Sequence, residues 1–416
     1  MAARISVDTD TWWHLRAGQW ILEHRSIPQV DSFSYTRAGQ PWQYPGWLVE
    51  APMYALFEAG GPGALNLWTA GMVTLAFVFI WYTLSGGVFL RAFAIVLAAT
   101  VSGVYWAARP YLATFLLSAV FLWILEDFRW RKIDRLWWLP VLMVIWVNSH
   151  GGFVAGFLLW GVYAAEALIF WLFARFSHAD SLSQSRQALV RLLTIGMFLF
   201  IGVLINPSGG VMFLYAFKTI RISALQEYIQ EWQSPDFHSI QVQPFVWLLL
   251  LTIAVIGASR RRLALSDYLL FSGFAYMGLM AARNVALFAL AAPVALTRYA
   301  APLLESLGRK LGYRGLGESR PLGISRHINW VLFALVFVAV VTKALLVYPA
   351  KVNEELFQST LPVGAVEYLR MVKPPGRLFN TYNWGGYLLW ALPEYPVFID
   401  GRTDLYSDEV INQWLQ

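Results

Sequence analysis

The 416-residue chain contains no cysteine and few charged residues, and both shortages narrow what it can be. Without cysteine it can form no disulfide, no thiol nucleophile and no cysteine-ligated zinc site, so any external part is held together by packing alone. Only 13% of its residues are charged and 58% are hydrophobic, whereas soluble domains are about 45 to 50% apolar. No signal peptide, internal repeat or low-complexity tract is visible. The proportions indicate a polytopic membrane protein.

The net charge of +6 does not indicate a nucleic-acid-binding protein. Basic residues fall in short clusters between apolar runs, where the orientation of the chain in a bilayer explains them. Nucleic acid is therefore excluded as a partner, and membrane lipid is expected instead.

Ten apolar runs have the length, or nearly the length, needed to cross a bilayer. Two of them, 137–148 and 244–257, are short for about 30 Å of hydrocarbon. The sequence thus predicts a mainly α, polytopic membrane helix bundle with about ten transmembrane helices. The runs are 65–84, 88–106, 111–127, 137–148, 152–174, 188–205, 244–257, 268–282, 285–300 and 329–348.

With ten helices, all the basic clusters fall on one side of the membrane. The positive-inside rule makes that side cytoplasmic and leaves the unusual polar motifs outside. The basic residues are Arg129, Arg131, Lys132, Arg135, Arg175, Arg186, Arg260 to Arg262, Arg309, Lys310, Arg314, Arg320 and Arg326.

Three regions are expected along the chain. The first has mixed polarity, frequent turn residues and an amphipathic stretch at 13–23, typical of short helices on the membrane surface. The regions are 1–64, an external first loop with surface helices and an acidic motif; 65–348, the transmembrane bundle; and 349–416, a small external α/β segment.

The last region changes in composition after Pro349. Val363–Val372 and Trp384–Leu392 resemble helices, while Arg377–Asn380 and Val397–Asp400 resemble short strands. This order is the beginning of an α/β unit, and we expect the natural protein to continue beyond Gln416.

The first loop opens with the most concentrated group of polar residues. Asp8, Asp10, His14 and Arg16 lie within nine residues beside Trp12 and Trp13. An Asp-x-Asp spacing can direct two carboxylates at one divalent cation or one sugar hydroxyl. A capped, solvated loop with an interfacial aromatic pair is an equally weighted alternative.

Two external arginines lie at the mouths of apolar helices with almost no loop around them, in Arg109-Pro110 and Arg283-Asn284. Each can hold a phosphate group or extend to the lipid headgroups, and the sequence alone leaves both open. The Gly-rich turns after His150 and Asn206 mark places where the backbone reverses at the same face.

Together these motifs resemble a family of bacterial polytopic membrane proteins in the GT-C glycosyltransferase superfamily, which take a sugar from a polyprenyl-phosphate donor. The resemblance covers nearly the whole chain. This sequence departs from the family pattern at Pro45-Gly46, where the family has an acidic residue, and it lacks the first transmembrane helix expected upstream. The matching pieces are Asp8 to Leu15, Trp42 with Trp47-Leu48 and Glu50, Ala108 to Pro110, Asn148 with His150-Gly151, Asn206-Pro207, Glu231-Trp232, Ser234 to Asp236, Arg283-Asn284, Asn383 to Tyr387 and Phe398 to Arg402.

The resemblance implies an integral-membrane glycosyltransferase, a hexosyl- or pentosyltransferase of the bacterial inner (plasma) membrane with its site on the outer side. A glycan, lipid or protein would be the acceptor. The implied catalytic residues are Asp8, Asp10 and Glu50, with Asp8 and Asp10 also able to hold a divalent cation such as Mg or Mn. The implied substrate-binding residues are His14, Arg16, Trp47, Arg109, His150, Asp236, Arg283 and Asn284.

Three other functions remain open at this point. A glycan ligase similar to O-antigen ligases would use external arginines in the same way, and a non-catalytic membrane scaffold has no distinguishing motif. A transporter predicts charged residues near the middle of helices, and Glu166 and Lys343 are the main ones here.

The orientation can be tested because the chain has no cysteine of its own. Single cysteines at Ser234 and Ser407 should react with a membrane-impermeant maleimide in intact cells, and one at Ser259 should react only after lysis. The reverse pattern would show that the external loops face the cytoplasm.

Overall fold

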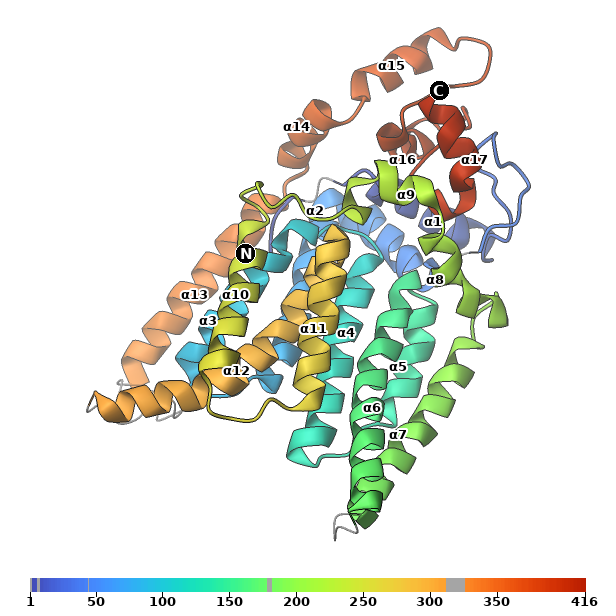
Figure 1. The fold of residues 1–416 in the computed structure, drawn as a ribbon. Helices are drawn as coiled ribbons and strands as arrows, with labels where there is room; N and C mark the ends of the chain where they lie inside the picture. Colours follow the sequence, from blue (N-terminus) through green and yellow to red (C-terminus); the bar gives the residue numbers. More distant parts are fainter. Residues whose placement is uncertain (1, 6–7, 44, 178–181, 312–325) are drawn as a thin grey trace.

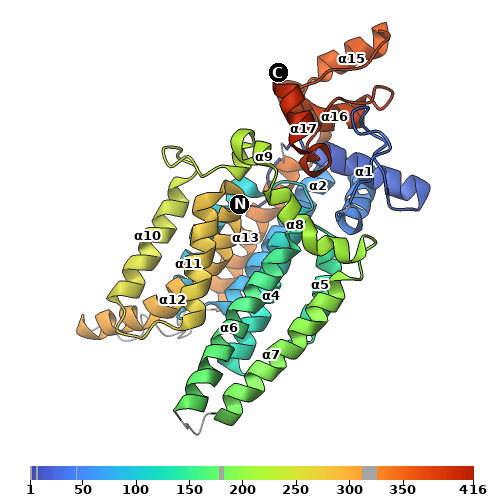
Figure 2. The same cartoon turned by 45° about the vertical axis from the view of Figure 1, so that its right-hand side comes forward.

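The computed structural model describes residues 2–5, 8–43, 45–177, 182–311 and 326–416, which are nearly all helical (Figure 1). One set of helices runs side by side as a bundle, and a second set gathers at one end of it (Figure 2). The bundle contains α2 (Trp47–Thr83), α3 (Val88–Ser102), α4 (Tyr111–Glu126), α5 (Trp138–Val147), α6 (Val154–Phe176), α7 (Leu182–Val203), α10 (Gln243–Ala258), α11 (Leu265–Met280), α12 (Val285–Lys310) and α13 (Arg326–Val347). The end contains α1 (Thr11–His24), α8 (Met212–Ile220), α9 (Ser223–Tyr228), α14 (Ala350–Thr360), α15 (Val363–Val372), α16 (Tyr382–Ala391) and α17 (Thr403–Leu415).

Helices α4 and α12 form the centre of the bundle. Helix α12 packs against α3, α10 and α11, and α4 packs against α2 and α6. Nearly every side chain from Val285 to Ala301 is buried. The many alanines of this stretch allow neighbouring backbones to approach closely, as is typical of helices that pack within membranes.

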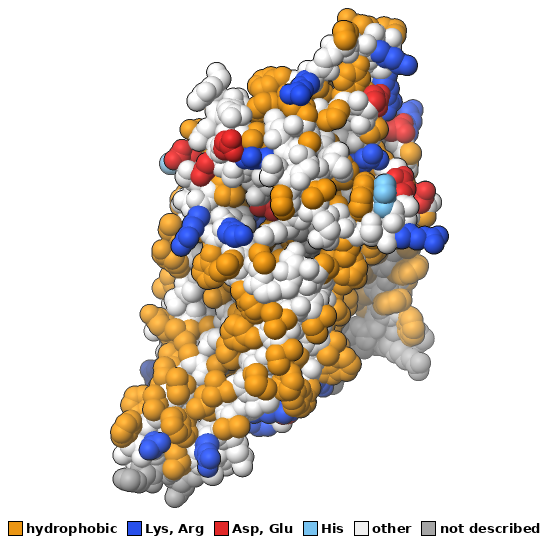
Figure 3. Space-filling model, turned by 90° about the vertical axis from the view of Figure 1, so that its right-hand side faces the viewer, with side chains coloured by type: hydrophobic (Ala, Val, Ile, Leu, Met, Phe, Trp, Pro, Cys, Tyr) orange, Lys and Arg blue, Asp and Glu red, His pale blue; other side chains and the backbone are white. Residues whose placement is uncertain are grey.

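Within the described residues, seven helices are long and apolar enough to span a membrane. Hydrophobic side chains cover the flank of the bundle, and charged side chains gather toward its two ends (Figure 3). The chain is therefore a multi-pass membrane protein, as the sequence predicted. The seven segments are Trp47–Thr83, Val88–Tyr105, Tyr111–Arg131, Gly151–Phe176, Leu182–Val203, Ala282–Lys310 and Ile328–Val347.

The predicted number of about ten transmembrane helices is not confirmed. The runs 137–148, 244–257 and 268–282 do form helices, but α5, α10 and α11 have only 10, 16 and 16 residues. A perpendicular span needs about 20 residues. These three helices lie alongside the longer ones in the bundle (Figures 1 and 2).

The basic connections lie at the end of the bundle opposite α1 and α14 to α17 (Figure 1). They follow α4, α6, α10 and α12, and Arg131 donates to the carbonyl of Tyr82 at the end of α2. Arg314 and Arg320, predicted to extend the last of these connections, lie outside the described residues. The basic connections therefore lie at one end of the bundle, as the sequence predicted. The side of the membrane that this end faces stays a prediction.

The predicted boundary at residue 64 falls inside a helix. Helix α2 starts at Trp47 and bends at Gly61, directly before Pro62. Gly61 has a φ of 61°, which glycine adopts at little energetic cost because it has no side chain. The first loop therefore joins the bundle through two helical stretches that meet at a kink at Gly61, close to the predicted boundary. The amphipathic stretch at 13–23 forms α1, as expected.

The external segment after Pro349 is helical, and its α/β character is not confirmed. Helices α15 and α16 form close to the predicted positions, but no strand forms at 377–380 or 397–400. One isolated parallel bridge joins Ser34 to Val397. One side chain takes the place of a sheet partner: Asn380 accepts from Phe398 N at 2.9 Å and donates to Ile399 O at 2.8 Å.

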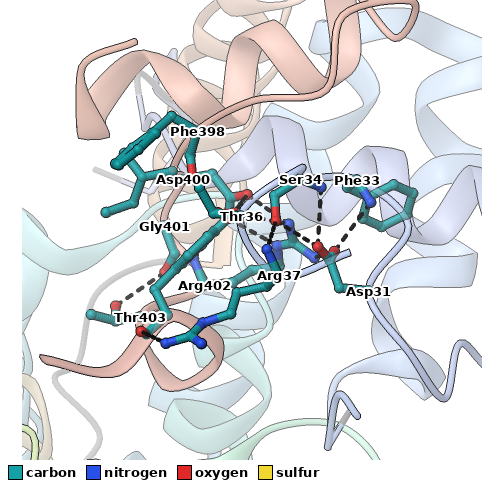
Figure 4. Close-up of polar contacts among 12 residues, drawn as sticks. Asp31, Phe33, Ser34, Thr36, Arg37, Phe398, Asp400, Gly401, Arg402 and Thr403 are labelled. Carbon is teal, nitrogen blue, oxygen red and sulfur yellow. Dashed lines mark hydrogen bonds and ion pairs between the residues drawn. The ribbon is translucent and has the colours of Figure 1, made fainter. Parts of the chain in front are cut away.

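A buried arginine joins this segment to the first loop (Figure 4). Arg402 binds Asp31 at 2.5 Å and both carboxylate oxygens of Asp400 at 2.9 and 2.7 Å, and all three side chains are at most 2% exposed. Burial alone would raise the pKa of Asp31, but Arg402 and nearby hydrogen-bond donors such as Ser34 hold that pKa below its ordinary value. We call this group the Arg402 clamp.

Breaking the Arg402 clamp should destabilise the protein strongly. Arg402→Met keeps much of the volume but leaves two buried carboxylates without their cation, which costs about 3 to 5 kcal/mol. The midpoint of unfolding in detergent should fall, and limited proteolysis should cut the segment from 377 onward faster. Glu409→Gln is the control, because it breaks an exposed pair with Arg37 that contributes about 0 to 1 kcal/mol. Equal behaviour of the two variants would contradict the clamp.

Candidate functional site

A cavity of about 790 Å³ lies at the end of the bundle where α1, α8, α9, α16 and α17 gather. Its walls come from the start of α1, the loop before α4, the turn before α6, the segment 215–232 and the segment 382–404. Part of the wall is apolar, including Leu158, Ile220 and Met277. The volume is within the range of small-molecule sites, and charged and apolar surfaces lie next to each other in it.

Asp8 and Asp10 enter this cavity from the polar turn that begins α1. The amide of Asp10 donates to Asp8 Oδ1 at 2.9 Å, and His14 N donates to the Asp10 carbonyl at 3.3 Å. Asp10 occupies the cap position of α1, yet its carboxylate makes no capping hydrogen bond. It is therefore available for interactions across the cavity.

Those interactions are with Arg109, which lies in the short connection before α4. Its Nε is 3.3 Å from Asp8 Oδ2, its Nη1 is 3.1 Å from Asp10 Oδ2 and its Nη2 is 3.3 Å from Glu231 Oε2. Burial would lower the pKa of Arg109, but the three carboxylates together raise it above the ordinary value. Arg109 is a permanent cation.

Arg283 approaches the same carboxylate from the start of α12. Its Nη1 lies 3.5 Å from Glu231 Oε1, and its guanidinium lies 4.3 Å from the ring centre of Trp232. Burial would raise the pKa of Glu231, but Arg283 and Arg109 hold it below the ordinary value. Within the described residues Arg283 has one ion pair, so most of its donors are available to a ligand.

Asp10 is the carboxyl group best prepared to exchange a proton near neutral pH. Burial and the neighbouring Asp8 raise its pKa to about 7, against the opposing effect of Arg109. Gly401 presses against it, since a Cβ at that position would lie 1.9 Å from Asp10 Oδ1. Only glycine allows the backbone of the C-terminal segment to approach the acid this closely.

A second buried pair lines the cavity behind this cluster. Nδ1 of His14 contacts Oε1 of Glu50, and the Glu50 side chain is fully buried with Oε2 unbonded among the described residues. A Cβ at Gly46 would lie 2.9 Å from Glu50 Oε1. The departure from the family pattern at Pro45-Gly46 thus makes room for the Glu50 carboxylate. Burial, with Arg109 and His150, lowers the pKa of His14 well below its ordinary value.

His150 is also held neutral at the cavity wall. Burial, with Arg283 and Arg109, lowers its pKa to about 3. Its Nδ1 accepts from Gly152 N at 3.0 Å and lies 2.8 Å from Thr114 Oγ1. We assign the ring proton to Nε2 on this basis, which leaves a neutral hydrogen-bond donor for a ligand.

The structure brings most of the predicted site residues together. Three do not line the cavity: Arg16 bonds Gln19 at 2.8 Å, Trp47 donates to Asn148 at 2.9 Å, and Asp236 accepts from the His238 amide at 3.0 Å. No three His, Asp or Glu side chains of the described residues converge on a point that would hold a metal ion. The residues that line the cavity are Asp8, Asp10, His14, Glu50, Arg109, His150, Arg283 and Asn284.

Sequence reasoning did not select four further residues of the cavity wall. Glu231 pairs with both arginines, and Asp404 accepts from Tyr215 at 3.0 Å. Tyr382 and Gly401 enter from the C-terminal segment. Glu231 and Gly401 belong to motifs that matched the family pattern, and those motifs could have identified them as site residues. Nothing in the sequence marked Asp404.

No protein-family model matches the sequence, and no curated protein does. Among solved structures, the chain is similar to the archaeal oligosaccharyltransferase AglB from Archaeoglobus fulgidus in complex with an inhibitory peptide and a dolichol-phosphate. The TM-score is 0.55 and the identity 12%, covering 96% of this chain and 61% of AglB. An apo crystal structure of the Archaeoglobus fulgidus oligosaccharyltransferase gives a TM-score of 0.46 at 12% identity over the same shares. At this identity, the similarity to the AglB complex shows a shared fold.

The raised pKa of Asp10 predicts a pH-dependent stability. The folded protein retains a proton that the unfolded chain releases, so stability falls as pH rises from about 4 to about 7 and changes no further above it. Asp10→Asn removes this ionisation, and its melting temperature relative to the natural protein should rise between pH 5 and pH 7.5. The exposed Glu227→Gln should follow the natural protein throughout. A constant difference between Asp10→Asn and the natural protein would contradict the assignment.

Proposed function

We propose that this chain is a GT-C-type glycosyltransferase that moves a hexosyl or pentosyl group from a polyprenyl-phosphate donor to an acceptor in the cavity, on the outer face of the membrane. The observation that carries the proposal is the cluster of Asp8, Asp10, Arg109, Glu231 and Arg283 beside an apolar wall. A lipid phosphosugar has the matching parts: an apolar chain, an anionic phosphate and a polar sugar. The acceptor, whether glycan, lipid or protein, would enter from the external side.

Arg283 is the residue we assign to the donor phosphate. Its guanidinium faces the cavity with a single ion pair to Glu231, whereas each nitrogen of Arg109 already faces a carboxylate. Arginine suits phosphate because its planar fork can bind two oxygens at once. His150 and Asn284, which line the same part of the wall, add neutral polar groups.

Asp10 is the residue we assign as the general base. It takes the proton of the acceptor's nucleophilic group as that group bonds to the anomeric carbon. The bond from that carbon to the phosphate oxygen breaks, and the phosphate leaves with the electron pair, stabilised by Arg283. A pKa of about 7 suits this role at neutral pH. Asp8, which bonds the amide of Asp10, supports its position.

The shared fold with AglB supports a lipid-phosphate donor, because the AglB structure is a complex with a dolichol-phosphate and an inhibitory peptide. The chain spans 61% of AglB, so what AglB binds enters here only as part of the proposal. A transporter is less well supported, since Glu166 on α6 pairs with Arg129, accepts from the Ser266 amide at 3.1 Å and does not line the cavity.

The test is transfer from a polyprenyl-phosphate monosaccharide by the full-length protein in liposomes. A positioned base contributes about 10² to 10⁴ in rate, so Asp10→Asn should lower turnover at saturating donor by that factor while Asp8→Asn costs less. Arg283→Ala should instead weaken donor binding about ten- to a hundredfold, the loss of one charge-assisted contact.

Two exposed residues near the cavity provide matched controls. Glu227→Gln removes an acid and Arg221→Ala removes a guanidinium, and neither residue lines the cavity. Both should behave as the natural protein does. Turnover that survives Asp10→Asn, together with unchanged donor affinity in Arg283→Ala, would refute the assignment of roles.

A further inference from the structure

Three carboxylates from two distant parts of the chain surround one guanidinium. Asp8 and Asp10 come from the start of α1 and Glu231 from the segment after α9. Each is paired with a different nitrogen of Arg109, at 3.1 to 3.3 Å. Each of the three nitrogens thus has one carboxylate oxygen within 3.3 Å, and the Arg109 side chain is only 16% exposed.

This arrangement differs from a divalent-cation site. Mg²⁺ and Ca²⁺ draw carboxylate oxygens to about 2.0 to 2.6 Å from a single point. Here the carboxylate oxygens are spread around the rim of a planar ion, each close to its own nitrogen. The described residues contain no group of three or more acidic, His or Cys side chains suited to an ion. The donor set therefore does not fit the Mg or Mn ion that the Asp-x-Asp spacing suggested.

Arg109 is also held firmly where it is. Its amide donates to the Ala107 carbonyl at 2.8 Å, its carbonyl accepts from Leu112 N at 3.1 Å, and Pro110 restricts the chain that follows. The guanidinium cannot withdraw from the carboxylates without unpairing three acids in a largely buried place. Such unpaired charges are costly.

We propose that Arg109 replaces a divalent cation in this site: it is a built-in positioning residue that gathers Asp8, Asp10 and Glu231, and the natural protein binds no metal ion there. The catalytic consequence, a sugar transfer that is insensitive to chelators, rests on the proposed function. The binding statement does not. A direct corollary is that removal of the guanidinium turns the three carboxylates into a cation site.

The experiment measures Mn²⁺ binding to the purified full-length protein by the loss of the free-ion electron paramagnetic resonance signal. The natural protein and Arg109→Lys, which keeps a cation, should show no saturable site below about 100 μM. Arg109→Ala and Arg109→Gln should bind one Mn²⁺ per chain at least about tenfold more tightly, because affinity follows the number of anionic ligands. Adding Asp10→Asn to Arg109→Ala should remove that site.

Arg221→Ala is the matched control, because it deletes an exposed guanidinium on the same face and should leave Mn²⁺ binding unchanged. One tightly bound Mn²⁺ in the natural protein that is lost in Asp10→Asn would overturn the proposal. Folded Arg109→Ala and Arg109→Gln that bind no better than the natural protein would also overturn it. If neither variant folds, the natural protein's own Mn²⁺ titration decides between the two outcomes.

Sugar transfer with and without chelator keeps the two proposals apart. Transfer that continues in excess EDTA supports the role of Arg109, and transfer abolished by EDTA and restored by Mn²⁺ overturns it. Absence of transfer under all conditions would count against the proposed function alone, since the Mn²⁺ titration still measures what the carboxylates bind.

Discussion

The attraction between the Arg109 guanidinium and three carboxylates organises the end of the bundle that carries the cavity. Charges that are largely removed from water must be paired, and here a single cation satisfies acids from the first loop and from the segment after α9. That requirement holds the start of α1 over the bundle and brings Glu231 within reach of Arg283 in the turn before α12. The same pairing leaves Asp10 with a pKa near 7, because Asp8 and burial outweigh the one arginine that faces it.

A second buried arginine extends this organisation to the C-terminal segment. The Arg402 clamp fastens 397–402 to the first loop, and the residue beside it, Gly401, lies directly against Asp10. The clamp and the cavity are therefore mechanically linked, since the turn that pairs Asp400 with Arg402 also closes one wall of the site. Packing elsewhere in the end region uses aromatic side chains, with Trp12 meeting Phe57, Phe357 and Tyr387 edge to face.

Much of this could be predicted from the sequence, for identifiable reasons. Apolar runs and basic clusters report directly on membrane helices, so the multi-pass bundle was predictable. The count of about ten was not confirmed because short runs were counted as spans, and the helices they form, α5, α10 and α11, have only 10, 16 and 16 residues. Motifs brought Asp8, Asp10, Arg109 and Arg283 into consideration because isolated charges are rare in such a chain. The sequence could not show that Arg109 is shared by three acids. Asp10 and Glu231 are far apart in the chain, and only the tertiary structure brings both of them to Arg109. Arg16, Trp47 and Asp236 have side chains suited to a site, but they do not line the cavity and instead bond Gln19, Asn148 and the His238 amide. The strands expected at 377–380 and 397–400 did not form: the first loop makes one isolated bridge at Val397, and the Asn380 side chain bonds the backbone of Phe398 and Ile399.

We propose above all that the cavity is where a polyprenyl phosphate binds. The most direct measurement is photo-crosslinking of the protein in liposomes with a polyprenyl phosphate that carries a diazirine in the isoprene unit next to the phosphate, followed by mapping of labelled peptides by mass spectrometry. If the lipid binds in the cavity, labels are expected on its apolar wall at Leu158, Ile220 or Met277. Excess unlabelled polyprenyl phosphate should remove these labels, and Arg283→Ala should reduce them. Labels confined to the lipid-facing surfaces of α7 and α13, and insensitive to the competitor, would contradict it.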